Sequence, residues 1–340
     1  MLTLRGVSRK FGAIEALRAV DLDVGADELV VVLGPTGAGK TTLLRTIAGL
    51  ETPDAGTMAM DGRDLASLAP AERDVALVFQ NFSLYPMWSV RRNMEFPLRA
   101  PGRKLDEAEI AKRVAWAAEL LRITKLLERP AGRLSGGEMQ RVAIGRAIVR
   151  RPRMFLMDEP LTNLDAKLRE TLRVELVALR RGLGTPMLFV THDQAEALSM
   201  ADRVAVLADG RVLQVGTPED VYRRPASPVV ARQLGQPAIN LLRVRRDGAQ
   251  WVTGAGVPVA SATEGESATV GVRPEDVAPD GGAHEGVVKG VEDMGPTRTL
   301  RVEWAGAEIH IVAPKTAAAP RPGDRVRPKI DPARAIVWPS

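Results

Sequence analysis

The residues best suited to chemistry form a glycine-rich stretch near the N-terminus, Gly34-Pro35-Thr36-Gly37-Ala38-Gly39-Lys40-Thr41-Thr42. It follows the apolar run 29–33 and precedes the helix-like segment 43–48. Glycines let main-chain N–H groups crowd around phosphate oxygens, and a following helix directs its positive end at the same anion. In the pattern G-x-x-x-x-G-K-[ST], the lysine reaches the β- and γ-phosphates and the next hydroxyl binds Mg²⁺. The sequence therefore predicts a nucleoside triphosphate site in which Lys40 and Thr41 take these roles.

A second set of reactive side chains follows two apolar, strand-like runs. The run 154–157 ends in Asp158 and Glu159, and the run 187–190 leads into His192. Ligands of open α/β sheets bind at the carboxyl ends of the strands. Asp158 suits a Mg²⁺ shell, and Glu159 suits polarising or deprotonating an attacking water. His192 is either structural or a hydrogen-bond donor to developing phosphate charge.

The stretch 134–138 has two interpretations. Ser135 and Glu138 fit a capping box, S-x-x-E, that opens a helix over 139–150. Gly136 and Gly137 remove side chains from the first turn of that helix, whose dipole can receive an anion. Local signals leave helix capping and anion binding equally open.

Three other features also stay open on local signals. Phe11 is either a core residue or a platform on which a flat base stacks. Gln80 closes a short strand signal and is commonly only a polar terminus. The segment 82–90 gathers Phe, Tyr, Met and Trp around a proline in a chain with 4% aromatic residues. That segment is either a satellite core or an apolar docking surface.

Composition narrows the class of protein. The 340 residues are 45% hydrophobic and 26% charged, which is typical of a globular protein of two domains, and no apolar run has the length of a membrane span. The absence of cysteine excludes disulfides and thiolate metal sites and is compatible with a reducing cytosol. The net charge of +5 is modest, and its arginines lack aromatic interleaving, so we expect no nucleic-acid partner.

Taken in order, these motifs resemble those of the ATP-binding subunits of ABC transporters over residues 1–220. The stretch 34–42 resembles the Walker A loop, Gln80 the Q-loop glutamine, and 134–138 the LSGG signature. The remaining correspondences are Walker B at 154–159, the D-loop at 162–165, which ends in Asp165, and the switch histidine at His192.

The resemblance implies an α/β P-loop NTPase fold with a helical subdomain at about 81–151. It implies ATP and Mg²⁺ as ligands, Phe11 as the adenine-stacking residue, and Gln80 as a contact to metal and water. It also implies a head-to-tail dimer with two sandwiched ATP molecules, in which Ser135 and Gly137 contact the γ-phosphate bound by the opposite subunit. Gly136 and Asp165 are also expected to bind the nucleotide. The second ATPase subunit is either an identical copy or a different chain.

The tail predicts a second domain. Short alternating segments at 268–272, 286–291, 299–304, 308–312 and 326–330 are separated by proline and glycine turns, which is typical of a small all-β, OB-like barrel. We place the nucleotide-binding domain at 1–235 and this barrel at 236–340. The stretch 271–276 resembles the regulatory-domain motif of importers related to the maltose transporter, which move sugars, polyols, glycerol phosphate or polyamines inward.

The resulting hypothesis is an ATPase that energises import of a small polar solute. Its partners would be membrane permease subunits at the cytoplasmic face of the membrane and, indirectly, an extracytoplasmic solute-binding protein. The segment 82–90 would then dock the coupling helices of the permease. Met87 stands where many relatives carry histidine, and Glu138-Met139 where many carry Gln-Arg.

Three rival functions fit the sequence less well than this hypothesis. A soluble ABC ATPase of DNA repair or translation usually has long coiled coils or two fused nucleotide domains, and this sequence shows neither feature. Glu159 and His192 disfavour a non-hydrolytic binding module as the sole function. An exporter commonly fuses this domain to membrane spans, and the sequence contains no apolar run of that length.

Overall fold

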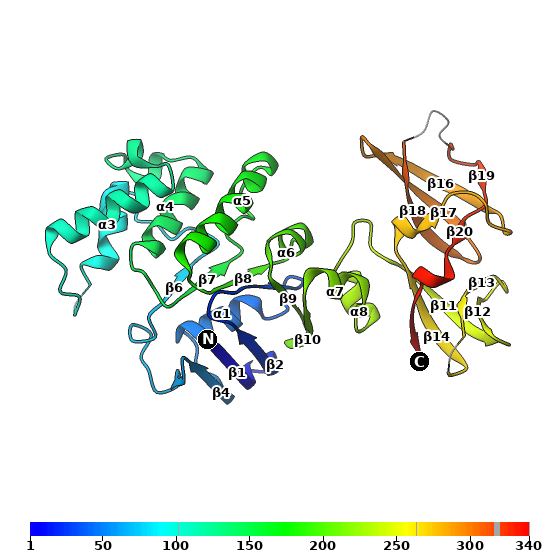
Figure 1. The fold of residues 1–340 in the computed structure, drawn as a ribbon, viewed down its shortest axis with the longest axis horizontal. Coiled ribbons are helices and arrows are strands. Elements are labelled where there is room, and N and C mark those ends of the chain that lie inside the picture. The colour runs from blue at the N-terminus through cyan, green and yellow to red at the C-terminus, as the bar shows by residue number, and fades with distance from the viewer. Residues whose placement is uncertain (101, 263, 316–319, 340) are drawn as a thin grey trace. The chain divides into compact units, whose positions relative to one another are not determined.

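The computed structural model describes residues 1–340 except 101, 263, 316–319 and 340. The chain divides into two compact units, Met1–Pro218 and Glu219–Ser340 (Figure 1). Residues 219–235, which the sequence analysis placed in the first domain, group with the second unit. Within the described residues, no helix combines the length and the apolar content needed to cross a bilayer.

A six-stranded sheet of order β10-β9-β3-β8-β7-β6 is the centre of the first unit. Its strands are β3 (Leu29–Leu33), β6 (Val75–Val78), β7 (Met154–Asp158), β8 (Met187–Thr191), β9 (Arg203–Ala208) and β10 (Arg211–Gly216). All neighbours are parallel except β10, which runs antiparallel to β9. Every residue of β3, β7 and β8 is buried, which explains their unbroken apolar runs. The parallel strands end at one edge, where the predicted reactive residues follow them.

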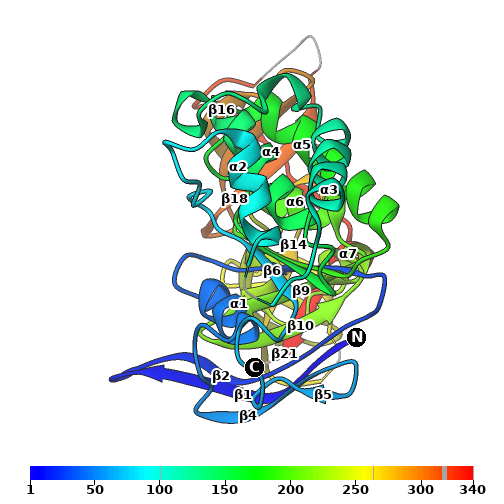
Figure 2. The same ribbon diagram turned by 90° about the vertical axis from the view of Figure 1, so that its left-hand side faces the viewer.

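A smaller antiparallel sheet of order β2-β1-β4-β5 covers helix α1 (Lys40–Ala48) on the side away from the central sheet (Figure 2). Its strands are β1 (Leu2–Phe11), β2 (Ile14–Val24), β4 (Ala55–Met60) and β5 (Arg63–Asp64). One buried cluster joins apolar side chains of β1, β2, α1 and β3. Apolar and polar residues alternate near the end of β2, where Val20, Leu22 and Val24 are all buried.

The helices of the first unit between β6 and β9 are α2 (Val90–Glu95), α3 (Glu107–Leu120), α4 (Gly136–Ile148), α5 (Ala166–Leu183) and α6 (Gln194–Met200), with 3₁₀ turns η1 (Phe96–Leu98), η2 (Thr124–Leu126) and η3 (Ala131–Arg133). Apolar residues keep helical spacing over 106–128, but the helix α3 ends at Leu120. The chain leaves the helix after Leu120 because Arg122 takes a left-handed conformation with φ 56°. Asp106 caps α3 by accepting a hydrogen bond from the Glu109 N–H at 2.7 Å.

The second unit is all-antiparallel in its strand pairing, as predicted, and carries helices α7 (Pro218–Arg223) and α8 (Pro228–Arg232) at its start. One sheet has the order β13-β12-β11-β14-β21, from strands β11 (Asn240–Asp247), β12 (Gln250–Thr253), β13 (Pro258–Ser261), β14 (Ser267–Val272) and β21 (Ile336–Pro339). The other has the order β18-β17-β16-β19, from β16 (Gly286–Asp293), β17 (Thr297–Trp304), β18 (Ala307–Pro314) and β19 (Arg325–Val326).

One apolar core, which includes the buried Trp251 and Trp304, joins these two sheets. The short pair β15 (Val277–Ala278) and β20 (Lys329–Ile330) and the turns η4 (Pro274–Asp276) and η5 (Pro332–Arg334) complete the unit. The strand predicted over 326–330 is instead two short strands, β19 and β20, separated by Arg327 and Pro328. Proline cannot donate the main-chain hydrogen bond that an uninterrupted strand would need.

Candidate nucleotide site

The loop between β3 and α1 accepts only glycine at two positions. A Cβ on Gly39, whose φ is 104°, would lie 2.2 Å from the carbonyl oxygen of Ala16. A Cβ on Gly34 would lie 2.2 Å from the carbonyl oxygen of Leu207. Gly37 also has a positive φ, 84°, but lies in open space. The loop is therefore packed tightly against β2 and β9 and turns its backbone toward the start of α1.

Lys40 is the first residue of α1, and its buried side chain turns back against this loop. Its ammonium group donates to the carbonyl oxygens of Gly34 at 2.9 Å and Pro35 at 3.0 Å. It also forms an ion pair with Glu159 Oε1 at 3.1 Å. A buried ammonium with carbonyl and carboxylate partners is a positive charge held at a defined point, as binding of a phosphate oxygen requires.

Glu159 directs its two carboxylate oxygens at different partners. While Oε1 faces Lys40, Oε2 lies 2.8 Å from His192 Nδ1 and accepts from the Thr162 hydroxyl at 3.3 Å. Burial alone would raise the pKa of Glu159, but the Lys40 ammonium and the His192 ring outweigh it, so the pKa is lowered overall. The residue has φ 43°, a left-handed conformation that is unfavourable for a residue with a Cβ. This conformation turns Glu159 out of the line of β7 and toward Lys40.

Asp158 lies on the other side of the same strand end. It is buried, and its Oδ1 accepts from the Thr41 hydroxyl at 3.0 Å. Burial raises the pKa of Asp158, and the hydrogen bond from Thr41 offsets this only in part. A buried carboxylate beside a hydroxyl is an oxygen donor pair that fits Mg²⁺. Among the described residues, no group of three or more His, Cys, Asp or Glu side chains is arranged to hold a metal ion.

A cavity of ≈ 540 Å³ opens over the loop. The predicted residues in its lining are Thr36, Gly37, Gly39, Lys40, Thr41, Thr42, Gln80 and Glu159. No sequence motif predicts the other wall, which consists of Ile14, Glu15, Ala16, Arg18, Asp209 and Gly210. No local pattern marks these residues, because only the pairing of β2 with the turn after β9, where the Arg18 N–H donates to the Gly210 carbonyl at 2.8 Å, brings them to the loop.

Other predicted site residues lie outside this cavity lining. Phe11 is exposed at the end of β1, and the guanidinium carbon of Arg9 lies 4.7 Å from the centre of its ring. His192 joins the site through Glu159 rather than through the lining.

The predicted signature residues also lie away from the cavity, where the starts of α4 and α5 meet. The capping box at Ser135 is present, so the structural interpretation of 134–138 is confirmed, and Asp165 caps α5 by accepting from the Leu168 N–H at 3.0 Å. A Cβ on Gly137 would lie 2.2 Å from the Leu168 side chain, so this glycine lets α4 and α5 approach.

Two residues of the segment 82–90, Tyr85 and Trp88, form an aromatic cluster with Phe96 of η1, and in it Tyr85 and Phe96 are exposed while Trp88 is half-buried. The rings of Tyr85 and Trp88 stack with their centres 4.1 Å apart, and Phe96 lies edge-on to Tyr85 at 5.2 Å. The buried Asn93 side chain holds Tyr85 by accepting from its N–H at 2.9 Å and donating to its carbonyl at 3.1 Å. The Met87 side chain beside this cluster is 87% exposed. The segment therefore presents apolar side chains on a backbone that hydrogen bonds hold in place.

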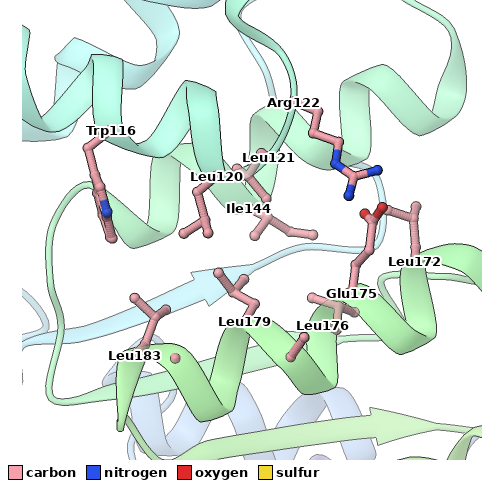
Figure 3. Close-up of a pocket in the computed structure, with 12 residues that line it drawn as sticks. Trp116, Leu120, Leu121, Arg122, Ile144, Leu172, Glu175, Leu176, Leu179 and Leu183 are labelled. Carbon is pink, nitrogen blue, oxygen red and sulfur yellow. The ribbon is translucent and has the colours of Figure 1, made fainter.

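A separate apolar cavity of ≈ 310 Å³ lies between the helices α3 and α4 and the helix α5 (Figure 3). Leucines from both sides point into it, among them Leu120, Leu179 and Leu183. At its edge the Arg141 guanidinium binds both oxygens of Glu175, at 2.5 and 3.2 Å. None of its lining residues belongs to the nucleotide cavity, so its leucines take no part in the phosphate chemistry.

Comparison with known proteins agrees with this geometry. Residues 17–162 match the ABC transporter family, and residues 270–338 match the TOBE domain. A relative from Cupriavidus necator, named sn-glycerol-3-phosphate import ATP-binding protein UgpC, is 45% identical over 346 residues, which cover 96% of this chain and 93% of the relative. The protein of the same name from Brucella abortus is 46% identical over 92% of this chain and 86% of its own length.

Solved structures show the same fold in the first unit. The dimeric post-hydrolysis state of the cassette MJ0796, bound to ADP and Pi, is 31% identical with a TM-score of 0.58, covering 64% of this chain and 99% of that one. The cbiO1 subunit from Clostridium perfringens, part of the transporter complex cbiONQ, is 29% identical with a TM-score of 0.60, covering 68% of this chain and 93% of that one. The chain belongs to the ATP-binding subunits of ABC transporters and is an ATPase of that family.

Proposed function

We propose that this ATPase energises the import of glycerol phosphate, or of a sugar or polyol of similar size, through a membrane permease. The relatives named for sn-glycerol-3-phosphate import cover nearly the whole chain and therefore favour that solute class. The observation that carries the hydrolytic part is the Lys40–Glu159–His192 group at the end of the nucleotide cavity. The subunit would act at the cytoplasmic face of the membrane, bound peripherally through its permease.

The proposed chemistry assigns one task to each side chain of this group. Lys40 would exchange its ion pair with Glu159 for a contact to the β- and γ-phosphate oxygens. Glu159, released on that side, would accept a proton from the attacking water, while His192 would donate a hydrogen bond to the charge that develops on the γ-phosphate. Thr41, Asp158 and Gln80 would hold Mg²⁺, which supplies positive charge to the phosphates.

The remaining predicted residues belong to contacts with other molecules. Ser135, Gly136, Gly137 and Asp165 would contact the ATP held by a second ATPase subunit, of the same or a different chain. Phe11, exposed at the end of β1, would stack on the adenine. The Tyr85–Trp88–Phe96 cluster with Met87 would dock the permease, and an extracytoplasmic solute-binding protein would deliver the solute to that permease.

Replacing Glu159 with Gln tests the proposed catalytic role. The amide cannot accept the proton from water, so we expect ATP hydrolysis to fall by at least ~100-fold while ATP remains bound. Phosphate release and retained nucleotide would be measured on the purified full-length chain. The control is Glu170→Gln, which removes an exposed carboxylate from α5. Hydrolysis by the Glu159→Gln variant at close to the wild-type rate would contradict the assignment.

A further inference from the structure

The only hydroxyl proton of Ser135 is already engaged within this chain. The Ser135 hydroxyl lies 2.9 Å from Glu138 Oε2, and the Ser135 N–H donates to the same oxygen at 2.8 Å. The backbone hydrogen bond from Ser135 opposes partial burial and lowers the pKa of Glu138, so the carboxylate is ionised at neutral pH. An ionised carboxylate can only accept hydrogen bonds. The Ser135 hydroxyl therefore donates its proton to Glu138.

A phosphate oxygen at Ser135 would compete with Glu138 for this proton. Phosphate is also an acceptor, and a hydroxyl has one proton to donate. A phosphate within hydrogen-bond distance of the hydroxyl would lie roughly 5–6 Å from the carboxylate, where two negative charges repel. Contact between Ser135 and phosphate thus requires Glu138 to move away.

A second partner for Glu138 lies close by. The Arg129 guanidinium is 3.8 Å from Glu138 Oε1, the oxygen that does not contact Ser135. Half of the Arg129 side chain and about a third of the Glu138 side chain are exposed, at 50% and 32%, so both have room to turn. Rotation of the carboxylate toward Arg129 would free the hydroxyl and neutralise the charge beside it.

We propose that Glu138 is a positioning residue that opposes the ATP-dependent pairing of two subunits. Pairing becomes possible when the Glu138 carboxylate moves from Ser135 to Arg129. The inference rests on the proposed function, because it takes Ser135 as a contact to the ATP of the opposite subunit. It adds a regulatory contact to that site: the Ser135 hydroxyl is withheld from phosphate in the unpaired chain.

The test compares dimer formation in variants that retain ATP. Glu138→Gln, Arg129→Gln and Glu109→Gln would each be added to the full-length Glu159→Gln chain, and the dimer dissociation constant would be measured by sedimentation with and without ATP. Glu109 is the matched control because it occupies the same helical position after its cap in α3 as Glu138 does in α4. Glutamine preserves a capping box, so the melting temperature should not change in Glu138→Gln.

The expected results differ in direction. Glu138→Gln removes the negative charge that opposes phosphate, and each dimer has two such sites. The substitution should therefore lower the ATP-dependent dissociation constant of the dimer by roughly tenfold or more. Arg129→Gln should raise it by about threefold, since the carboxylate loses its second partner. Glu109→Gln should leave it unchanged, and no variant should change the affinity of the monomer for ATP. Loss of a merely structural contact would not strengthen pairing.

The outcomes separate this inference from the proposed function. If the Glu159→Gln chain forms no ATP-dependent dimer, the proposed sandwich of two copies of this chain fails and the inference fails with it. If that dimer forms but Glu138→Gln leaves it unchanged or weakens it, only the role of Glu138 is overturned. Equal strengthening with and without ATP would also overturn that role, because it would reflect general surface charge.

Discussion

Asp158 and Glu159 are adjacent in the chain, yet the protein shifts their pKa values in opposite directions. Asp158 remains on β7, where burial raises its pKa and Thr41 is its hydrogen-bond partner. For Glu159, burial acts in the same direction, but the left-handed turn brings its carboxylate to Lys40 and His192, which lower its pKa. Opposite environments suit the two neighbouring carboxyl groups to the different roles proposed for them, one as a metal ligand and one as a proton acceptor.

The raised pKa of Asp158 predicts a stability effect in the nucleotide-free protein. The folded chain binds more protons than the unfolded chain between the unfolded value, 3.8, and the higher folded value, so ionisation above this window destabilises it. Asp158→Asn removes the charge and should raise the melting temperature at pH 7 by about 2–4 °C. That gain over wild type should shrink as the pH falls through the window. Calorimetry without nucleotide from pH 7 to pH 4 checks this, and a lower melting temperature for the variant at pH 7 would contradict it.

At the scale of elements, the loop before α1 depends on close packing against its neighbours. Gly34 and Gly39 are confined by carbonyl oxygens of β9 and β2, so the conformation of the loop depends on strands on either side of it. By contrast Gly182, near the end of α5, has no atom within 4 Å of the position that a Cβ would take. The same residue type is thus required in the loop and dispensable in the helix.

Replacing each glycine with alanine should have opposite effects on stability. Gly39→Ala would force the loop away from Ala16 and should both destabilise the protein and abolish ATP binding. Gly182→Ala should stabilise it by about 0.5–1 kcal/mol, because alanine loses less backbone freedom in a helix. Urea unfolding with a nucleotide-binding assay checks both. Normal ATP binding by Gly39→Ala would contradict the role given to the loop.

At the scale of the whole molecule, the first unit separates its chemistry from its proposed docking surface. The nucleotide cavity contains the charged Lys40 and Glu159 and lies at the edge of the central sheet, whereas the Tyr85–Trp88–Phe96 cluster is a partly exposed apolar feature of the helical region. The Arg146 guanidinium donates to the carbonyl oxygens of Phe82 at 2.9 Å and Ser83 at 2.6 Å, which ties the segment after Gln80 to α4. A movement of α4 would therefore act directly on this segment.

Introducing a charge beside the aromatic cluster tests its proposed role. Met87→Glu places a carboxylate where an apolar contact is expected, and recovery of the permease with the tagged chain from membranes should fall by about tenfold or more. Val174→Glu is the control, since Val174 is also exposed, at 64%, but lies on α5. Both variants should keep the wild-type melting temperature. Undiminished recovery with Met87→Glu would show that this surface is not the docking site.

The amino-acid sequence by itself predicted the α/β fold, the all-β second domain and the order of the nucleotide motifs, because these depend on the local spacing of residues. Apolar runs marked β3, β7 and β8, and glycines marked the loop before Lys40. Only the tertiary structure decided that Glu159 lies between Lys40 and His192, that Ile14–Arg18 line the cavity, and that α3 ends before Arg122. The physical reason is that the site and its walls depend on strand pairing between residues far apart in sequence, while the end of α3 depends on a left-handed residue that the helical spacing does not mark.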